Sequence, residues 1–458
     1  MAAELHSTLL AGLRAGFAGE VITPGGAGYD EARTVFNSMI DRHPQVIAQC
    51  EGPADVAAAI AFARENGLEI AVRAGGHAVS GASVNDGLVV DLRRMNSVVV
   101  DPEAGTARVG GGALMADLDG ATQRYGLATT GGRDSSTGVA GLTLGGGSGW
   151  LERKYGLACD NLLAATLVTA EGELVTADED RHPELFWALH GGGGNFGVVT
   201  QLTFRLHELP NFTMALLLWQ PEAGPDILRR FREYMAGAPE EIGGGFVYLT
   251  GPPAPFVPAE LVGKRGVGVL LTYTGGEAAA REVFAPMLGH GHIGEMIAEL
   301  PYAEVQCMLD DPPGERNYWS AEYLSEFPEQ AVELFCARGE EMISPSASMH
   351  AFFPMGGAVA RGAGDYPVPW RVAPWAVHPF GVWEDPADDA RGTAWARGVR
   401  EDMLPWSIGA VYLNFIGDEG PERVAAGLGT GNARRLAAVK SAYDPENVFH
   451  LNHNIVPA

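Results

Sequence analysis

Arg73-Ala-Gly-Gly-His77-Ala-Val-Ser-Gly81 is the most informative segment of the chain. It follows a β-rich segment, 68–73, and therefore predicts a strand that runs into a loop. Consecutive small residues let backbone N–H groups approach and surround an anion such as a pyrophosphate. His77 lies at the tip of this predicted loop. Because an isolated Gly-Gly-His is more often a tight turn with a surface histidine, its meaning depends on the rest of the chain.

Two further glycine-rich segments accompany this loop. Gly131–Gly149 is too long for one turn and indicates backbone that lies flat against a large planar or phosphorylated ligand. Gly192–Gly197 matches the G-x-G-x-x-G pattern of dinucleotide-binding folds, but it follows a predicted helix and precedes a predicted strand, 198–204. That order is the reverse of the strand–loop–helix order that the pattern requires, so NAD is not the expected ligand.

Composition excludes several classes of protein. The chain has 458 residues, of which 62 are glycine, and 46% of its residues are hydrophobic, which excludes collagen-like and disordered chains. A net charge of −26 opposes nucleic-acid binding. No apolar run reaches the roughly 18 residues of a membrane span, and no basic leader opens the chain. We therefore expect no nucleic-acid or membrane partner and a cytoplasmic location, with the four widely spaced cysteines reduced.

The periodicity of apolar residues changes near Pro210. Before it, short strands and helices alternate; the helices are expected at 53–66, 114–125 and 183–189, and the strands at 68–73, 88–92, 97–101, 106–109, 162–170 and 173–176. After it come longer apolar segments, 214–219, 245–250, 267–274, 350–354 and 411–416, with amphipathic helices at 226–235 and 329–343. This pattern indicates an antiparallel sheet with helices on one side. A helix at 432–442 and a polar tail, Tyr443–Ile455, end the chain.

Four motifs in this order carry a resemblance to a known family. They are the R-x-G-G-H loop, G-x-x-G-L-x-x-G-G-G at Gly138–Gly147, G-G-N-F-G-V-V at Gly193–Val199, and Y-D-P-x-N-x-F-x-x-N-x-N-I at Tyr443–Ile455. Together they resemble the FAD-linked oxidases of the berberine bridge enzyme type, in the vanillyl-alcohol oxidase superfamily. The resemblance runs from about Gly19 to Val456 and is weakest between Pro210 and Met349.

This resemblance implies an α+β fold with two domains. A PCMH-type FAD-binding domain of two small α/β subdomains would comprise residues 1–210 and 418–458. A substrate domain with an antiparallel sheet flanked by helices would comprise residues 211–417 and cover the flavin ring.

The resemblance also implies a covalent flavin. In the family, the histidine of the Gly-Gly-His loop is bonded to the flavin 8α-methyl carbon, and His77 matches it. Many members carry a second link from a cysteine, and here Asp134 occupies that position, so only one covalent bond is expected. Thr137 matches a residue thought to control dioxygen access. The residues expected to contact FAD are Arg73, Ala74, Gly75, Gly76, His77, Ser80, Gly81, Gly131, Thr137, Gly138, Gly141, Leu142, Gly146, Asn195, Gly197, Val199, Asn452 and Asn454.

The expected catalytic pair is Tyr412 and Asn414, which resembles the family's Y-x-N. If 411–416 is a strand, alternation places both side chains on one face, and a tyrosine with a lowered pKa can take the substrate proton. Arg371 and His378 are weaker catalytic candidates. Trp319, Trp375 and Trp383 are expected near the pocket, and Ser320 replaces a family lysine. No metal site is expected, because His43, His182, His290 and His292 lack carboxylates at ligand spacing.

The function expected from the resemblance is that of an FAD oxidase, with hydrogen peroxide as the second product. The substrate would be a small molecule that bears a hydroxyl group: a sugar, an aromatic alcohol or another natural product. Two alternatives stay open, a cyclic amine oxidase of the 6-hydroxynicotine type and a dehydrogenase with an acceptor other than dioxygen. A binding protein without turnover is a further alternative. The chain is expected to be a monomer or a homodimer.

Overall fold

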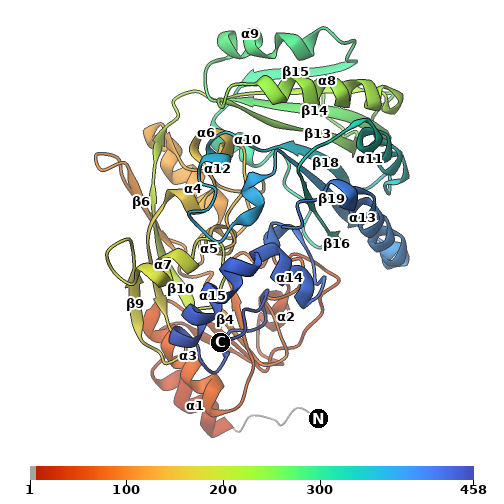
Figure 1. Ribbon diagram of the computed structural model, residues 1–458. Helices are drawn as coiled ribbons and strands as arrows, with labels where there is room; N and C mark the ends of the chain where they lie inside the picture. Colours follow the sequence, from red (N-terminus) through yellow and green to blue (C-terminus); the bar gives the residue numbers. More distant parts are fainter. Residues whose placement is uncertain (1–6) are drawn as a thin grey trace.

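A computed structural model describes residues 7–458 of the chain as three main sheets with helices around them (Figure 1). The first sheet has the order β1-β2-β4-β3, and its strands are β1 (Glu20–Ile22), β2 (Val46–Gln49), β4 (Leu88–Asp91) and β3 (Ile70–Arg73). Strands β2, β4 and β3 are parallel, and Arg73 pairs with Asp91 at their carboxyl ends. The Gly-Gly-His loop therefore leaves the edge at which ligands bind in parallel sheets.

The second sheet is antiparallel and lies beside the first. Its order is β5-β6-β10-β8-β9, and its strands are β5 (Val98–Asp101), β6 (Thr106–Gly110), β10 (Val198–Arg205), β8 (Leu162–Val168) and β9 (Leu174–Ala177). β8 and β9 pair as a hairpin that turns at Gly172, which has a φ of +80° that favours glycine. Two short strands, β7 (Leu127–Ala128) and β11 (His207–Glu208), pair with each other as an antiparallel ladder in this region.

The helices of this part of the chain cover the two smaller sheets and support the loops. They are α1 (Ser7–Ala15), α2 (Tyr29–Arg33), α3 (Pro53–Glu65), α4 (Met115–Thr122), α5 (Val139–Leu144), α6 (Glu152–Tyr155) and α7 (Pro183–Ala188). The helices predicted at 53–66 and 183–189 are confirmed within one residue. The helix predicted at 114–125 ends as a 3-10 turn, Gln123–Tyr125.

The third sheet has eight strands and is antiparallel throughout. Its order is β15-β12-β14-β13-β18-β19-β16, with β17 also paired to β19. The strands are β12 (Thr213–Trp219), β13 (Ile242–Thr250), β14 (Arg265–Tyr273), β15 (Gly294–Glu299), β16 (Arg316–Trp319), β17 (Glu322–Leu324), β18 (Met349–Pro354) and β19 (Trp375–Trp383). The predicted antiparallel sheet is therefore confirmed.

Helices cover one face of this third sheet. They include α8 (Gly224–Gly237), α9 (Glu277–Leu288), α11 (Glu329–Glu341) and α13 (Asp389–Met403); α10 (Tyr302–Gln306) and α12 (Ala358–Arg361) lie elsewhere. Alternate strand residues, such as Phe246, Val269 and Phe352, pack into this helix-covered core. The other face carries Gly245, Leu270 and their neighbours and is turned toward the glycine-rich loops.

The last helices return to the first part of the chain. They are α14 (Pro421–Leu428) and α15 (Thr430–Tyr443), and α15 packs against α7 (Figure 1). Lys440 of α15 is fully buried and donates to the carbonyl oxygens of Asn195 and Phe449 and to the carboxylate of Asp444. One lysine thus joins α15 to the third glycine segment and the polar tail. The division into domains at residues 210 and 418 stays a prediction.

One predicted strand is wrong. The segment 411–416 forms no β-strand; a 3-10 turn, Leu413–Phe415, takes its place. Val411 and Leu413 are buried in the core beneath the glycine-rich loops, where no strand among residues 7–458 pairs with them. Within residues 7–458, no helix combines the length and apolarity that crossing a membrane requires.

Candidate active site

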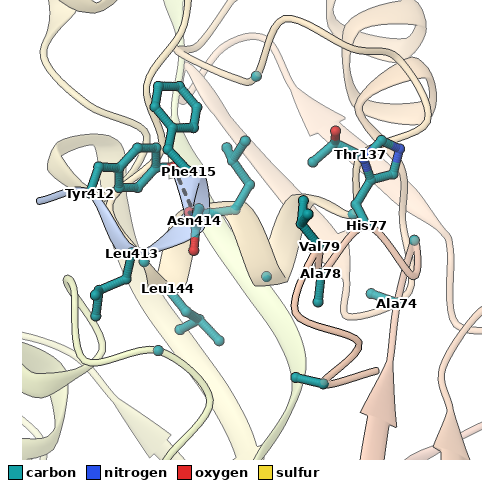
Figure 2. A pocket seen from close by; sticks show the side chains of 18 of the residues that line it. Ala74, His77, Ala78, Val79, Thr137, Leu144, Tyr412, Leu413, Asn414 and Phe415 are labelled. Atoms are coloured by element: carbon teal, nitrogen blue, oxygen red, sulfur yellow. Dashed lines mark hydrogen bonds between the residues drawn. The ribbon is translucent and has the colours of Figure 1, made fainter. Parts of the chain in front are cut away.

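A cavity of about 360 Å³ lies where the three glycine segments meet the open face of the large sheet. Its wall also includes the 3-10 turn near Tyr412 and the polar tail near Asn452. Figure 2 shows His77 and Thr137 on one side of the cavity and Tyr412, Asn414 and Phe415 on the other. Segments that are distant in the sequence therefore contribute to one elongated site.

The Gly-Gly-His loop presents unused hydrogen-bond donors to this cavity. Within residues 7–458, none of the backbone N–H groups of residues 75–80 donates a hydrogen bond to the protein. Six consecutive free donors suit the oxygen atoms of a pyrophosphate. Asn452 also lines this cavity. Its side-chain oxygen is buried, and no hydrogen-bond partner for it is found within residues 7–458. These groups fit the diphosphate and polar ring edge of FAD.

Glycine is required where the first two loops touch. A Cβ atom added to Gly75 would lie 2.5 Å from the backbone nitrogen of Gly138. A Cβ atom added to Gly138 would lie 2.6 Å from the backbone nitrogen of Gly75. Because both obstacles are backbone atoms, neither loop can move aside cheaply. The two loops thus form one continuous backbone surface.

Tyr412 and Asn414 form a hydrogen-bonded pair in the cavity wall. The Asn414 amide Nδ2 donates to the Tyr412 hydroxyl oxygen at 2.8 Å, and the backbone N–H of Gly147 donates to the same oxygen at 3.0 Å. Burial raises the pKa of Tyr412 above its ordinary value, while these donors act in the opposite direction. The tyrosine and the asparagine meet as expected, but through a turn rather than through strand alternation.

His77 lies in a polar cluster at the opposite end of the cavity. Its Nε2 atom is 2.6 Å from the Ser136 hydroxyl oxygen and 3.5 Å from the Asp134 carboxylate. Phe36 stacks on the imidazole ring, with 3.9 Å between the ring centroids. Burial lowers the pKa of His77, and the carboxylates of Asp134 and Asp310 oppose that shift. A neutral imidazole retains the lone pair that a nucleophile needs.

The sheet side of the cavity is almost entirely apolar. The strand residues that line it are Gly245, Val247, Leu270, Trp319, Met349, Ala351, Phe353 and Phe380. None of them carries a charge or a hydroxyl group. Apolar and aromatic walls of this kind bind flat, weakly polar ligands, whereas a sugar needs many hydrogen-bond partners.

Most of the residues expected at the cofactor line this cavity. Those in the wall are Ala74, Gly75, Gly76, His77, Ser80, Thr137, Gly138, Gly141, Leu142, Asn195, Gly197, Val199, Asn452, Tyr412 and Asn414. Those outside the wall are Arg73, Gly81, Gly131, Gly146, Asn454, Arg371 and His378. The three glycine-rich segments and the Y-x-N segment therefore do converge, although not every residue of each motif faces the cavity.

Local packing explains three of the residues outside the wall. The Arg73 side chain is buried and bonds to the carbonyl oxygen of Ala32. Arg371 is fully buried in an ion pair with Asp160 at 2.7 Å. His378 lies behind the cavity wall and stacks on Phe380, with 3.6 Å between the ring centroids. None of these three reaches the cavity directly.

Two tryptophans expected near the pocket lie on the other face of the large sheet. Trp375 packs into the core under the helices. Trp383 donates its indole N–H to Asp389 at the start of α13. In β19 the two tryptophans lie on the same face of the sheet as Val377, whereas His378 and Phe380 lie on the opposite face. Trp319 alone of the three lines the cavity.

Sequence reasoning missed several residues in the wall. Arg133 lies between the aromatic rings of Trp150 and Phe353 and forms an ion pair with Glu152 at 2.9 Å. His453 of the tail lines the cavity and donates to the carbonyl oxygen of Leu413 at 2.9 Å. A charged side chain inside a glycine-rich loop is a signal that could have pointed to Arg133. Only the chain fold places His453 beside the turn.

Comparisons with known proteins agree with this site. Residues 44–178 match the family described as FAD binding domain, and residues 411–456 match the family described as berberine and berberine like. (R)-6-hydroxynicotine oxidase of Paenarthrobacter nicotinovorans is 34% identical over 457 residues, which covers 96% of this chain and 97% of that protein. The chain belongs to the berberine bridge enzyme-like FAD-linked oxidoreductases.

Solved structures support the same assignment. The crystal structure of 6-hydroxy-D-nicotine oxidase from Arthrobacter nicotinovorans has a TM-score of 0.84 at 31% identity and covers 96% of this chain and 98% of its own. BBE-like 1 of Physcomitrella patens has a TM-score of 0.87 and covers 98% and 99%, but at 22% identity it shows the fold alone. The expected α+β, PCMH-type fold is confirmed. This berberine bridge enzyme-like chain is an FAD-linked oxidoreductase with a small-molecule substrate.

Proposed function

We propose that this protein is an oxidase whose FAD is bonded to His77, with no second bond from Asp134. It would remove hydride from a substrate carbon that bears a hydroxyl or amine group. The observation that carries the proposal is the position of the Tyr412–Asn414 pair in the cavity wall, across from His77. When bound, FAD supplies the hydride acceptor and passes two electrons to dioxygen, which gives hydrogen peroxide.

Tyr412 is the proposed base. Its hydroxyl oxygen accepts two N–H donors, and no acceptor for its own proton is found within residues 7–458. The same donors stabilise a phenolate, because a hydrogen bond to the charged form favours that form. In this phenolate form, Tyr412 can take the proton from the substrate heteroatom as hydride leaves the adjacent carbon. The lowered pKa expected from the sequence is not found, because burial raises the pKa of Tyr412. Asn414 holds the phenol in position and is the proposed second residue of the pair.

The apolar sheet wall supports an aromatic substrate over an oligosaccharide. Trp319, Phe353 and Phe380 offer ring faces and edges to a flat ligand, whereas no strand residue of the wall offers a hydroxyl, amide or charged partner to a sugar. An aromatic alcohol is therefore the first candidate substrate. The relative named (R)-6-hydroxynicotine oxidase favours a second candidate, a cyclic amine attached to an aromatic ring.

A substrate panel tests the proposal. Aromatic secondary alcohols, benzylic alcohols, aromatic cyclic amines and oligosaccharides would be assayed for peroxide formation and, without oxygen, for loss of the flavin absorbance. We expect turnover with an alcohol or an amine from the aromatic groups. Loss of absorbance without peroxide, together with slow reoxidation in air-saturated buffer, would identify a dehydrogenase instead. No response to any compound would support a binding protein.

The covalent link has a test of its own. The protein would be denatured in acid and its mass measured. We expect flavin to stay on the wild-type chain and to separate from His77→Ala. Flavin that separates freely from the wild type would refute the link, and retention in His77→Ala would indicate another anchor.

A further inference from the structure

His77 is connected to a carboxylate through one serine. The Ser136 hydroxyl donates to Asp134 Oδ1 at 2.7 Å, and the Ser136 backbone N–H donates to the same oxygen at 2.8 Å. The Ser136 hydroxyl oxygen is also 2.6 Å from His77 Nε2. The side chains of His77 and Asp134 are 12% and 16% exposed, whereas Ser136 between them is exposed at the surface.

The donors and acceptors in this series of hydrogen bonds determine where the protons lie. A serine hydroxyl has one proton, and here that proton points to Asp134. The Ser136 oxygen must then accept from His77, which places the imidazole proton on Nε2. In a neutral imidazole the lone pair is then on Nδ1. The structure thus selects one tautomer of His77.

We propose that Asp134, acting through Ser136, is the base that lets His77 form its covalent bond to FAD, and that the bond is made by Nδ1. This inference rests on the covalent link proposed above. It assigns a role to the residue that stands where relatives are expected to have a second cysteine. Asp134 would thus assist the covalent bond from His77, and its role would not be limited to the absence of a bond from a cysteine.

The proposed step alkylates His77. Nδ1 of His77 forms a bond to the 8α-methyl carbon of FAD, and one C–H bond of that methyl group breaks. The imidazole would become a cation, so its Nε2 proton passes to Ser136 as the serine proton passes to Asp134. The methyl carbon would lose its C–H hydrogen as a proton and two electrons, which would pass through the flavin to dioxygen. Dioxygen would take up two protons, equal in number to the methyl proton and the imidazole proton released, and leave as hydrogen peroxide. Dioxygen is therefore the oxidant of the step.

Neighbouring carboxylates are less suited to this role. Asp310 accepts from the backbone N–H and the hydroxyl of Ser135, the serine next to Ser136. Asp311 is connected through its backbone N–H, which donates to Asp134 Oδ2 at 3.1 Å. No hydrogen bond joins either side chain to His77 within residues 7–458. Asp134 is the carboxylate to which the imidazole proton has a continuous path.

Adjacent serines provide a matched test. Ser136→Ala breaks the path, whereas Ser135→Ala alters the same loop without touching it. Full-length protein would be produced without flavin and mixed with FAD in air, and samples would be precipitated with acid to measure the flavin retained by the chain. We expect linkage at least about tenfold slower in Ser136→Ala and Asp134→Asn than in the wild type. Ser135→Ala should match the wild type.

Each outcome decides something different. Equal rates in all variants would overturn the relay, and a slow Asp134→Asn with a normal Ser136→Ala would overturn the role of the serine. A wild-type chain that retains no flavin would overturn the covalent link of the proposed function, and the relay with it. FAD bound before acid treatment, measured by absorbance after gel filtration, controls for folding.

The nitrogen that carries the flavin gives a test without variants. A flavin peptide from the digested wild-type protein would be analysed by NMR. Attachment at Nδ1 supports the relay. Attachment at Nε2 would overturn it, because Ser136 faces that atom.

Discussion

The Tyr412 hydroxyl is a single group on which the proposed chemistry depends. In Tyr412→Phe the Gly147 N–H and the Asn414 amide lose their acceptor, but the ring packing stays. We expect flavin reduction by substrate to slow about 100-fold while bound flavin is retained. Stopped-flow absorbance without oxygen measures both quantities. Tyr318→Phe is the matched control, because that hydroxyl accepts from Arg397 outside the cavity.

The same tyrosine predicts a pH dependence. Burial raises its pKa above the ordinary value near 10, so the phenol is protonated at neutral pH. Raising the pH increases the fraction of the basic form. The rate of flavin reduction should therefore climb from about pH 7 to about pH 10 in the wild type and stay nearly flat in Tyr412→Phe. A similar climb in both proteins would exclude Tyr412 as the base.

Lys440 holds the C-terminal segments together through three buried hydrogen bonds. It is fully buried, and Lys440→Met leaves Asp444, which is also fully buried, without its cation. Removing one partner of a buried ion pair costs about 3–5 kcal/mol. We expect a lower Tm and a lower occupancy of FAD, since the tail and Asn195 both line the cavity region. Lys264→Met, at an exposed lysine, should leave Tm unchanged; an equal loss would contradict this role.

Two short helices join the first part of the chain to the large sheet region. Asp119 of α4 accepts from the Gln306 amide of α10 at 3.2 Å, and its other oxygen is buried without a partner among residues 7–458. Burial raises the pKa of Asp119 to about 7. The native state therefore keeps a proton that the unfolded chain loses above about pH 4, so stability falls between about pH 4 and pH 7.

Asp119→Asn removes this titration. An amide keeps the size of the side chain and adds a donor for the buried Gln306 oxygen. The ionised carboxylate costs the wild type at most about 4 kcal/mol above pH 7. We expect Tm to rise by several degrees near pH 8 and by less near pH 5, measured by thermal unfolding. An equal gain at both pH values would show that the carboxylate does not titrate as described.

The elements show where sequence prediction succeeds and where it fails. Helix α3 and the strands β12, β13, β14 and β18 were predicted from the spacing and length of their apolar segments, whereas β15, β16 and β17 were not. The segment 411–416 is as apolar and as long as the predicted strands 214–219 and 245–250, but packing beneath the glycine-rich loops made it a turn. The alternation of side chains along β19 can be read from the sequence, but the face that the helices cover cannot. Trp375 and Trp383 were therefore predicted on the wrong side of the sheet.

At the scale of the whole molecule, the three glycine-rich segments come together around one cavity. The motifs predicted which loops would meet, and the structure brings residues of all three to one cavity. A sequence motif does not say which of its residues face the ligand, so Arg73 and Gly81 were expected at the cofactor but lie outside the wall. Arg133 and His453 were not predicted, because their positions depend on contacts between segments that are distant in the chain.

The net charge of the whole molecule predicts that charged and neutral substrates respond differently to salt. The chain carries 31 basic and 57 acidic residues, and Asp134 lines the cavity, whereas Arg133 is neutralised by Glu152. A field of this sign attracts cations and raises their rate of association, and salt screens it. The two candidate substrates differ in charge at neutral pH, because a cyclic amine is protonated and an aromatic alcohol is not.

Ionic strength should therefore separate these substrates. Between about 10 mM and about 500 mM salt, we expect the second-order rate constant of flavin reduction to fall several-fold for a protonated amine. For a neutral alcohol of similar size it should stay constant, which controls for effects of salt on the protein itself. Stopped-flow measurements at low substrate concentration give this constant directly. An amine that reacts at a rate independent of salt would show that the acidic surface does not guide substrates to the cavity.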